Sequence, residues 1–133
     1  MTSHPLDRAV TCAERGLQQA EREVEGAEYE LERAETELEI AERDLDSAQD
    51  QLDIERDQRE PGDRELYFAE WEVRCAEREV RRAEKEVCHS VRELDRAERQ
   101  LYRAESELER ALRELDRELE RRREVARAKR AQP

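Results

Sequence analysis

The chain has few aromatic residues and no long apolar segment. Its 133 residues include three tyrosines, one tryptophan and one phenylalanine, and hydrophobic residues of all kinds make up 35% of the sequence. A compact domain of this length needs more apolar side chains to fill its core. No apolar run approaches the roughly 20 residues that span a bilayer, so we expect no contact with membranes. The composition therefore leaves two classes of chain, long helices and disorder.

Cysteine and histidine are scarce, which argues against a disulfide framework and against a metal site. Cys12, Cys75 and Cys88 are odd in number, so they cannot all pair within one chain. His89 follows Cys88, but neighbours on a helix point about 100° apart and are poorly placed to bind one ion. His4 lies near the N-terminus, and neither histidine is placed as a base beside a nucleophile in a recognisable catalytic pattern. We therefore expect no enzyme, no cofactor and no metal, and free thiols in a reducing compartment.

Charge is abundant and mostly negative. The chain has 38 acidic and 26 basic residues, which gives a net charge of -12. This charge opposes attraction of the whole chain to nucleic acid or to anionic membranes. The first ten residues, MTSHPLDRAV, contain no apolar signal segment. We therefore expect a cytoplasmic protein, or a nuclear one in a eukaryotic host.

An alanine repeat with a period of seven favours helices over disorder. In the stretch AETELEIAERDLDSAQ, residues 34–49, alanine recurs every seven residues and leucine follows four residues after it. This is the spacing from position d to position a of a heptad. The d positions of this half of the chain are Ala13, Ala20, Ala27, Ala34, Ala41 and Ala48. The a positions are Val10, Leu17, Val24, Leu31, Leu38, Leu45 and Leu52.

One break interrupts the repeat, at the sequence REPGDREL. Pro61 cannot donate an intrahelical hydrogen bond, and it disfavours helical geometry at Glu60. Pro61 and Gly62 suit the two central positions of a type II turn, where glycine tolerates a positive φ. Asp63 can then cap the N-terminus of a second helix. The sequence therefore predicts two helices joined by one sharp reversal.

The same repeat resumes after the reversal, so residues 1–133 should form a single helical hairpin. We expect a first helix over about 5–59, a turn over 60–63, a second helix over about 64–129, and a basic C-terminal overhang over 120–133. The small residues of the second half are Ala69, Ala76, Ala83, Ser90, Ala97, Ala104 and Ala111. The large residues are Leu66, Val73, Val80, Val87, Leu94, Leu101, Leu108 and Leu115.

Small residues of the two halves meet when the chain folds back at Gly62. Ala34 then lies opposite Ser90, and Ala41 lies opposite Ala83, whereas a shift of about three residues gives mixed layers of alanine and leucine. The seam resembles the close-packed antiparallel helix pair called an Alacoil, over roughly residues 10–115. The resemblance implies an all-α fold, a long antiparallel two-helix coiled-coil hairpin, and no particular function. The alternative is that alanine only favours helix formation, without close packing.

The most specific group of side chains lies beside the predicted turn. We call Ile54, Tyr67, Phe68 and Trp71 the turn cluster. The second helix carries Phe68, Trp71 and Cys75 on one face at spacing i, i+3 and i+7. Exposed, these side chains would be a candidate partner-binding site, since Trp and Tyr often anchor interfaces. Buried, they would close the end of the hairpin.

A basic segment, RRREVARAKR, ends the second helix and should project beyond the first helix, helical at first and then fraying. Its basic residues are Arg121, Arg122, Arg123, Arg127, Lys129 and Arg130. They could contact RNA, an acidic partner or the acidic helix of another copy. They could also simply complement the negative end of the helix dipole.

We expect a non-enzymatic structural or adaptor protein that mediates protein–protein interaction and has the capacity to self-assemble, although no residue identifies its partner. The alternative is an acidic inhibitor, or nucleic-acid mimic, that occupies a basic groove. Residues 1–60 support the alternative, because they hold 19 acidic and 7 basic residues. A third hypothesis is an acidic hairpin tip, with Asp57, Glu60 and Asp63, that enters an enzyme channel as Gre-type transcription factors do. No accessory globular domain accompanies this tip.

Overall fold

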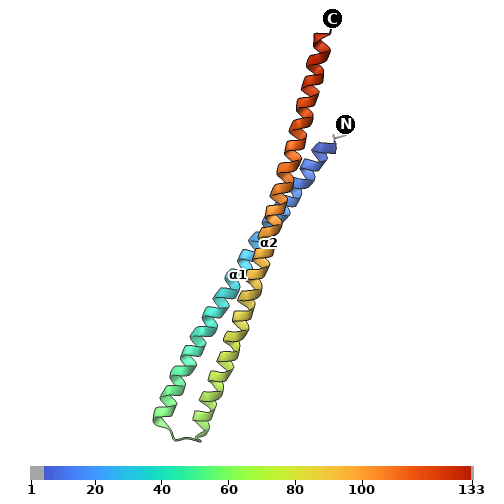
Figure 1. Cartoon of the computed structure of the whole chain (residues 1–133). Helices are drawn as coiled ribbons and strands as arrows, with labels where there is room; N and C mark the ends of the chain where they lie inside the picture. The colour runs from blue at the N-terminus through green and yellow to red at the C-terminus, as the bar shows by residue number, and fades with distance from the viewer. Residues whose placement is uncertain (1–4, 133) are drawn as a thin grey trace. The chain divides into compact units, whose positions relative to one another are not determined.

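Two α-helices make up nearly all of the described chain. The computed structural model describes residues 5–132, in which α1 spans Pro5–Gln58 and α2 spans Arg64–Ala131 (Figure 1). No strand occurs between residues 5 and 132. The prediction of an all-α helical hairpin is confirmed, because the two helices reverse direction at the turn and pack against each other. The ends of α1 and α2 lie within two residues of the expected positions.

The chain divides into two compact units, and each contains a segment of both helices. We call Gly26–Leu94 the turn unit, since it includes the loop between α1 and α2. Residues up to Glu25 and from Asp95 onward form the terminal unit. Each unit is described separately below.

The core of the turn unit lies beside the loop. Leu52 of α1 and Leu66, Ala69 and Val73 of α2 are buried together, and Leu45 and Ala48 pack against them. All six occupy predicted a or d positions. Farther from the loop, the buried alanines of this unit are Ala34, Ala41 and Ala83. The side chains repeated every seven residues are therefore the ones that are buried, as the hydrophobic effect predicts for an amphipathic helix.

Ala34 and Ser90 both line one groove of about 530 Å³ in the turn unit. Both residues therefore face the space between α1 and α2, as their d positions predict. Their exact pairing across this space stays a prediction, as does the close Alacoil-like approach of the two backbones. Charged side chains also line this groove, including Glu30 and Glu86 from the g positions.

The acidic side chains beside the seam on α1 remain in water. On α1, all of the glutamates at e positions are exposed, from Glu14 to Glu42. Ion pairs on these surfaces are short-range and intrahelical, such as Arg33 with Glu37 at 3.6 Å and Arg82 with Glu79 at 3.3 Å. Exposed pairs of this kind contribute little to stability. The seam, and not the charged surface, therefore supplies most of the packing energy.

The terminal unit buries the same kinds of side chain. Val10 and Ala20 are buried on α1, and Ala97 and Ala111 are buried on α2. From residue 119 to residue 132, every residue of α2 and its end is exposed. The segment is nevertheless helical to Ala131, which includes most of the part that was expected to fray.

Candidate interaction site at the helical turn

The loop between α1 and α2 is a tight turn centred on Pro61 and Gly62. Gly62 has a φ of 92°, and the Asp63 N–H donates to the Glu60 carbonyl oxygen at 3.2 Å. A positive φ at the third residue and a hydrogen bond from the fourth residue to the first fit a type II turn. Pro61 supplies the fixed negative φ of the second residue. The local residue types therefore place the reversal within four residues.

Asp63 caps the start of α2. Its Oδ1 accepts a hydrogen bond from the Glu65 N–H at 2.9 Å, and its carbonyl accepts one from the Tyr67 N–H at 3.0 Å. A side-chain oxygen that accepts from the second helical N–H satisfies a donor that has no partner within the helix. The cap fixes the direction in which α2 leaves the turn. This direction orients Tyr67 and Phe68, one turn later, and Trp71, two turns later.

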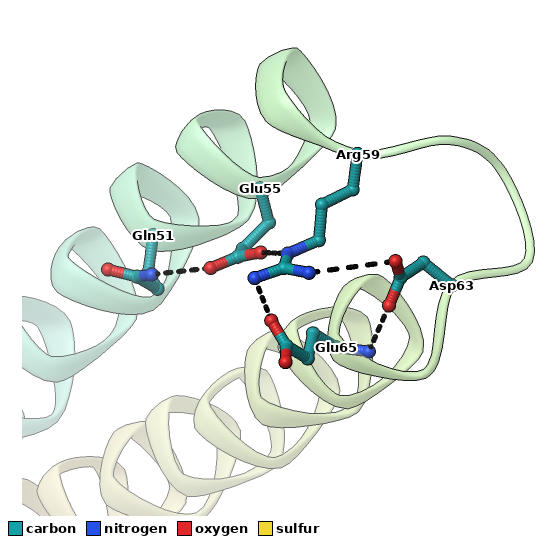
Figure 2. Close-up of polar contacts among 5 residues, drawn as sticks. All are labelled: Gln51, Glu55, Arg59, Asp63 and Glu65. Atoms are coloured by element: carbon teal, nitrogen blue, oxygen red, sulfur yellow. Dashed lines mark hydrogen bonds and ion pairs between the residues drawn. The ribbon is translucent and has the colours of Figure 1, made fainter.

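A cluster of polar contacts around Arg59 ties the two helices together at the turn (Figure 2). Arg59 Nε donates to Glu55 Oε2 at 2.5 Å, Arg59 Nη1 lies 3.6 Å from Asp63 Oδ2, and Arg59 Nη2 pairs with Glu65. Gln51 Nε2 donates to the other oxygen of Glu55 at 3.1 Å. One guanidinium thus joins the end of α1, the turn and the first turn of α2, which matches the several donors that arginine presents in one plane.

Partial burial strengthens these contacts. The side chain of Glu55 is 15% exposed and that of Arg59 is 34% exposed, so both are better shielded than most charged residues of the chain. The hydrogen bond to Glu55 raises the pKa of Arg59 above its usual value, and the nearby charges of Glu65 and Asp63 act in the same direction. The guanidinium therefore stays charged at physiological pH.

Sequence reasoning missed Glu55 and Arg59, although the repeat contained the signal. Glu55 lies seven residues after Ala48 and therefore occupies a d position. Arg59 lies seven residues after Leu52 and occupies an a position. Two charged residues of opposite sign occupy the last a and d positions before the turn. They predict an ion pair that covers the end of the hydrophobic core next to the turn.

The turn cluster lies on the surface and does not close the end of the hairpin. The exposed fractions are 64% for Tyr67, 54% for Phe68, 50% for Trp71 and 47% for Ile54. Phe68 and Trp71 stack on each other, with ring centroids 5.7 Å apart and planes inclined by 30°. Of the two interpretations of this cluster, the geometry supports the exposed one. The stacked pair presents a preformed apolar surface.

A groove of about 420 Å³ lies next to this surface. Its apolar lining comes from Phe68 and Ala69, and its carboxylates come from Glu55, Glu65 and Glu72. Gln51 and Arg64 complete the lining. A groove of this kind can accept an apolar side chain together with a cationic neighbour. The region beside it, residues 50–72, contains nine acidic and three basic residues, so its field favours positively charged partners.

The remaining candidate residues lie apart from the turn. The basic residues between Arg121 and Arg130 are exposed on α2 of the terminal unit. His89 lines the groove beside Ala34 and Ser90, and His4 lies outside the described residues. Within residues 5–132, no three His, Cys, Asp or Glu side chains are grouped to hold a metal ion. Over the same range, neither helix is long and apolar enough to cross a membrane.

Fold and site together define a class of protein: an all-α helical hairpin with an aromatic cluster exposed at its turn. Comparison with protein-family models, with curated proteins and with solved structures finds no match to this chain.

Proposed function

We propose that this chain is a non-enzymatic adaptor that binds a partner protein through the turn cluster. The observation that carries the proposal is the exposure of three of the five aromatic side chains of the chain at one turn. Solvent-exposed Tyr67, Phe68 and Trp71 lose hydrophobic stabilisation in the free protein. A partner that covers these side chains buries them and regains this stabilisation. Trp and Tyr contribute to interface hot spots in this way.

The Arg59 contacts support this proposal because they make the site rigid. The end of α1 and the start of α2 are joined through one guanidinium, and Asp63 caps α2. A rigid site loses less conformational entropy on binding than a flexible loop does. The carboxylates of the adjacent groove, from Glu55, Glu65 and Glu72, favour a partner with basic residues around an apolar one.

Replacing Tyr67 and Trp71 by alanine should weaken partner binding by at least about a hundredfold, because two hot-spot side chains are removed. The measurement is pull-down from the native host, followed by titration of the captured partner against purified protein. The matched control replaces Tyr29 and Tyr102, which are 65% and 71% exposed on α1 and α2 away from the turn.

The control variant should bind like the unchanged chain, and both variants should keep their helical circular dichroism. Full capture by the Tyr67→Ala, Trp71→Ala variant would show that the turn cluster is not the docking point. Equal loss in both variants would assign binding to exposed tyrosines in general and would also contradict the proposal.

A second candidate function is an acidic inhibitor that occupies a basic nucleic-acid-binding groove. The exposed carboxylates of α1 favour it, since residues 1–60 carry a net charge of -12 and the glutamates at e positions all face water. Such an inhibitor should displace DNA or RNA from its target, with an affinity that falls steeply as salt is added. Binding that leaves the nucleic acid in place would exclude this candidate.

The cytoplasm is the compartment that we propose for either function. Cys12 and Cys88 are exposed free thiols, and Cys75 is half-buried and also unpaired. Exposed free thiols persist best where the surroundings are reducing.

A further inference from the structure

The outer side of α2 in the turn unit is basic, although the chain as a whole is acidic. Positions b, c and f of the heptad lie on the side of a helix that points away from the seam. On α2, these positions hold six basic residues and no acidic residue between residues 72 and 94. On α1, the same positions hold six acidic and two basic residues between residues 29 and 57. We call the six basic residues of α2 the basic face; they are Arg74, Arg78, Arg81, Arg82, Lys85 and Arg92.

The basic face lies in water, and most of its charge is not neutralised by an ion pair. All six residues are exposed. Arg82 pairs with Glu79 at 3.3 Å, whereas the other five make no ion pair with any residue between 5 and 132. One groove of about 470 Å³ is lined by Arg78, Arg81, Arg82 and Lys85. Cations that share one groove repel one another, and an anion that enters the groove relieves this repulsion.

Five of these cations form a single row along α2. Positions b and f alternate along the row in steps of four and three residues, which correspond to about 6 Å and about 4.5 Å along the helix axis. The row extends over about 27 Å. Its members are Arg74, Arg78, Arg81, Lys85 and Arg92, with one interruption at Cys88. A row of regularly spaced cations fits a linear chain of negative charges, such as the phosphates of a nucleic acid strand.

We propose that the basic face binds single-stranded nucleic acid through its phosphates. The e and g positions on the two sides of the basic face carry exposed carboxylates, as at Glu77 and Glu79. These carboxylates would repel the second strand of a duplex, so the face accommodates one strand only. Trp71 precedes Arg74 in the same row and is 50% exposed. One end of the row therefore offers an aromatic ring on which a base can stack.

A nucleic acid strand suits this face better than an acidic protein does. Ion pairs between exposed side chains are weak, so an acidic protein surface gains little from these cations. Each neutralised phosphate of a nucleic acid also releases a condensed counterion, and this gain grows with the number of phosphates contacted. The net charge of -12 opposes the approach of the strand at long range, which limits the affinity. Strand binding through these cations does not require that the turn cluster binds a protein.

Fluorescence anisotropy of a labelled strand of about 12 thymidylates, titrated with the full chain, tests the proposal. We expect a Kd of about 10–100 µM at low salt. The logarithm of the association constant should fall with the logarithm of the salt concentration with a slope of about -3.5, because each of five phosphate contacts contributes about -0.7. The triple variant Arg78→Gln, Arg81→Gln, Lys85→Gln should bind at least about tenfold more weakly, with a slope of about -1.4, since two contacts remain.

The matched control is the triple variant Arg22→Gln, Arg33→Gln, Arg43→Gln. It makes the same change in net charge at exposed c and f positions of α1. It should bind the strand within about twofold of the unchanged chain, because salt screens charges that do not touch the phosphates. Circular dichroism should show that both triple variants stay helical.

Four outcomes would overturn the proposal. The first is no binding of the single strand at protein concentrations up to about 1 mM in low salt. The second is an equal loss of affinity in both triple variants, which would assign binding to net charge. The third is a duplex of the same length that binds as tightly as the single strand. The fourth is displacement of the labelled strand by polyglutamate as readily as by an unlabelled strand, which would assign the basic face to acidic proteins.

Discussion

Leu52→Ala is expected to lower the free energy of unfolding by about 2–4 kcal/mol. Leu52 is 7% exposed and is the α1 member of the buried cluster that also contains Leu66, Ala69 and Val73 of α2. Removing three carbon atoms there loses apolar burial and leaves a cavity between two helices. Alanine keeps the helix propensity high, so the loss reports packing and not helix formation.

Ile54→Ala is the matched control for this change. Ile54 lies two residues away on the same helix and is 47% exposed, so the same kind of truncation should cost about 1 kcal/mol or less. Urea unfolding followed by circular dichroism measures both values. A loss at Leu52 no larger than that at Ile54 would contradict the cluster as the core of the turn unit.

Ala41→Leu is expected to destabilise the protein by about 1–3 kcal/mol, although leucine is the more hydrophobic residue. Ala41 is 8% exposed at a d position of the seam. If small residues let α1 and α2 approach closely, a leucine at this position forces the helices apart or adopts a strained rotamer. If alanine is present only because it favours helices, leucine fills empty space and raises the melting temperature. The sign of the change therefore separates the two interpretations of the alanine stripe.

Ser47 provides the control for helix propensity and for the added side chain. It lies on the exposed side of α1, six residues from Ala41. The variants Ser47→Ala and Ser47→Leu differ by the same exchange of alanine for leucine, and their stabilities should differ by less than about 0.5 kcal/mol. Thermal unfolding of all three variants, measured side by side, gives the comparison. A higher melting temperature for Ala41→Leu than for the unchanged chain would contradict a close seam.

The two helices and the turn between them could be predicted from the local preferences of individual residues. Pro61 and Gly62 specify a turn through their own backbone preferences, and Asp63 caps a helix through a side chain two residues from its donor. The buried stripe followed from the seven-residue repeat, because the geometry of an α-helix carries residues seven apart to the same side. None of these steps requires knowledge of the other helix.

The polar contacts of Arg59 were harder to predict, because they depend on both helices at once. Glu55 is four residues from Arg59 on α1, but Glu65 belongs to α2 and reaches the guanidinium only after the turn closes. The repeat places Glu55 and Arg59 on the seam, and the turn decides which carboxylates surround the cation. The spacing of residues along α1 does not give the distance from the Arg59 guanidinium to a carboxylate on α2.

The order of residues alone was enough to predict the all-α hairpin, its turn, the cap at Asp63 and the side of each helix that is buried, since each depends on backbone preferences and on helical periodicity. The folded molecule was needed to establish that Tyr67, Phe68 and Trp71 face water, that a groove lies beside them, and that α2 stays helical to Ala131, where fraying was expected. The physical reason is that the exposure of a side chain beside the turn depends on how the two helices pack there. A pattern along one helix does not contain that arrangement.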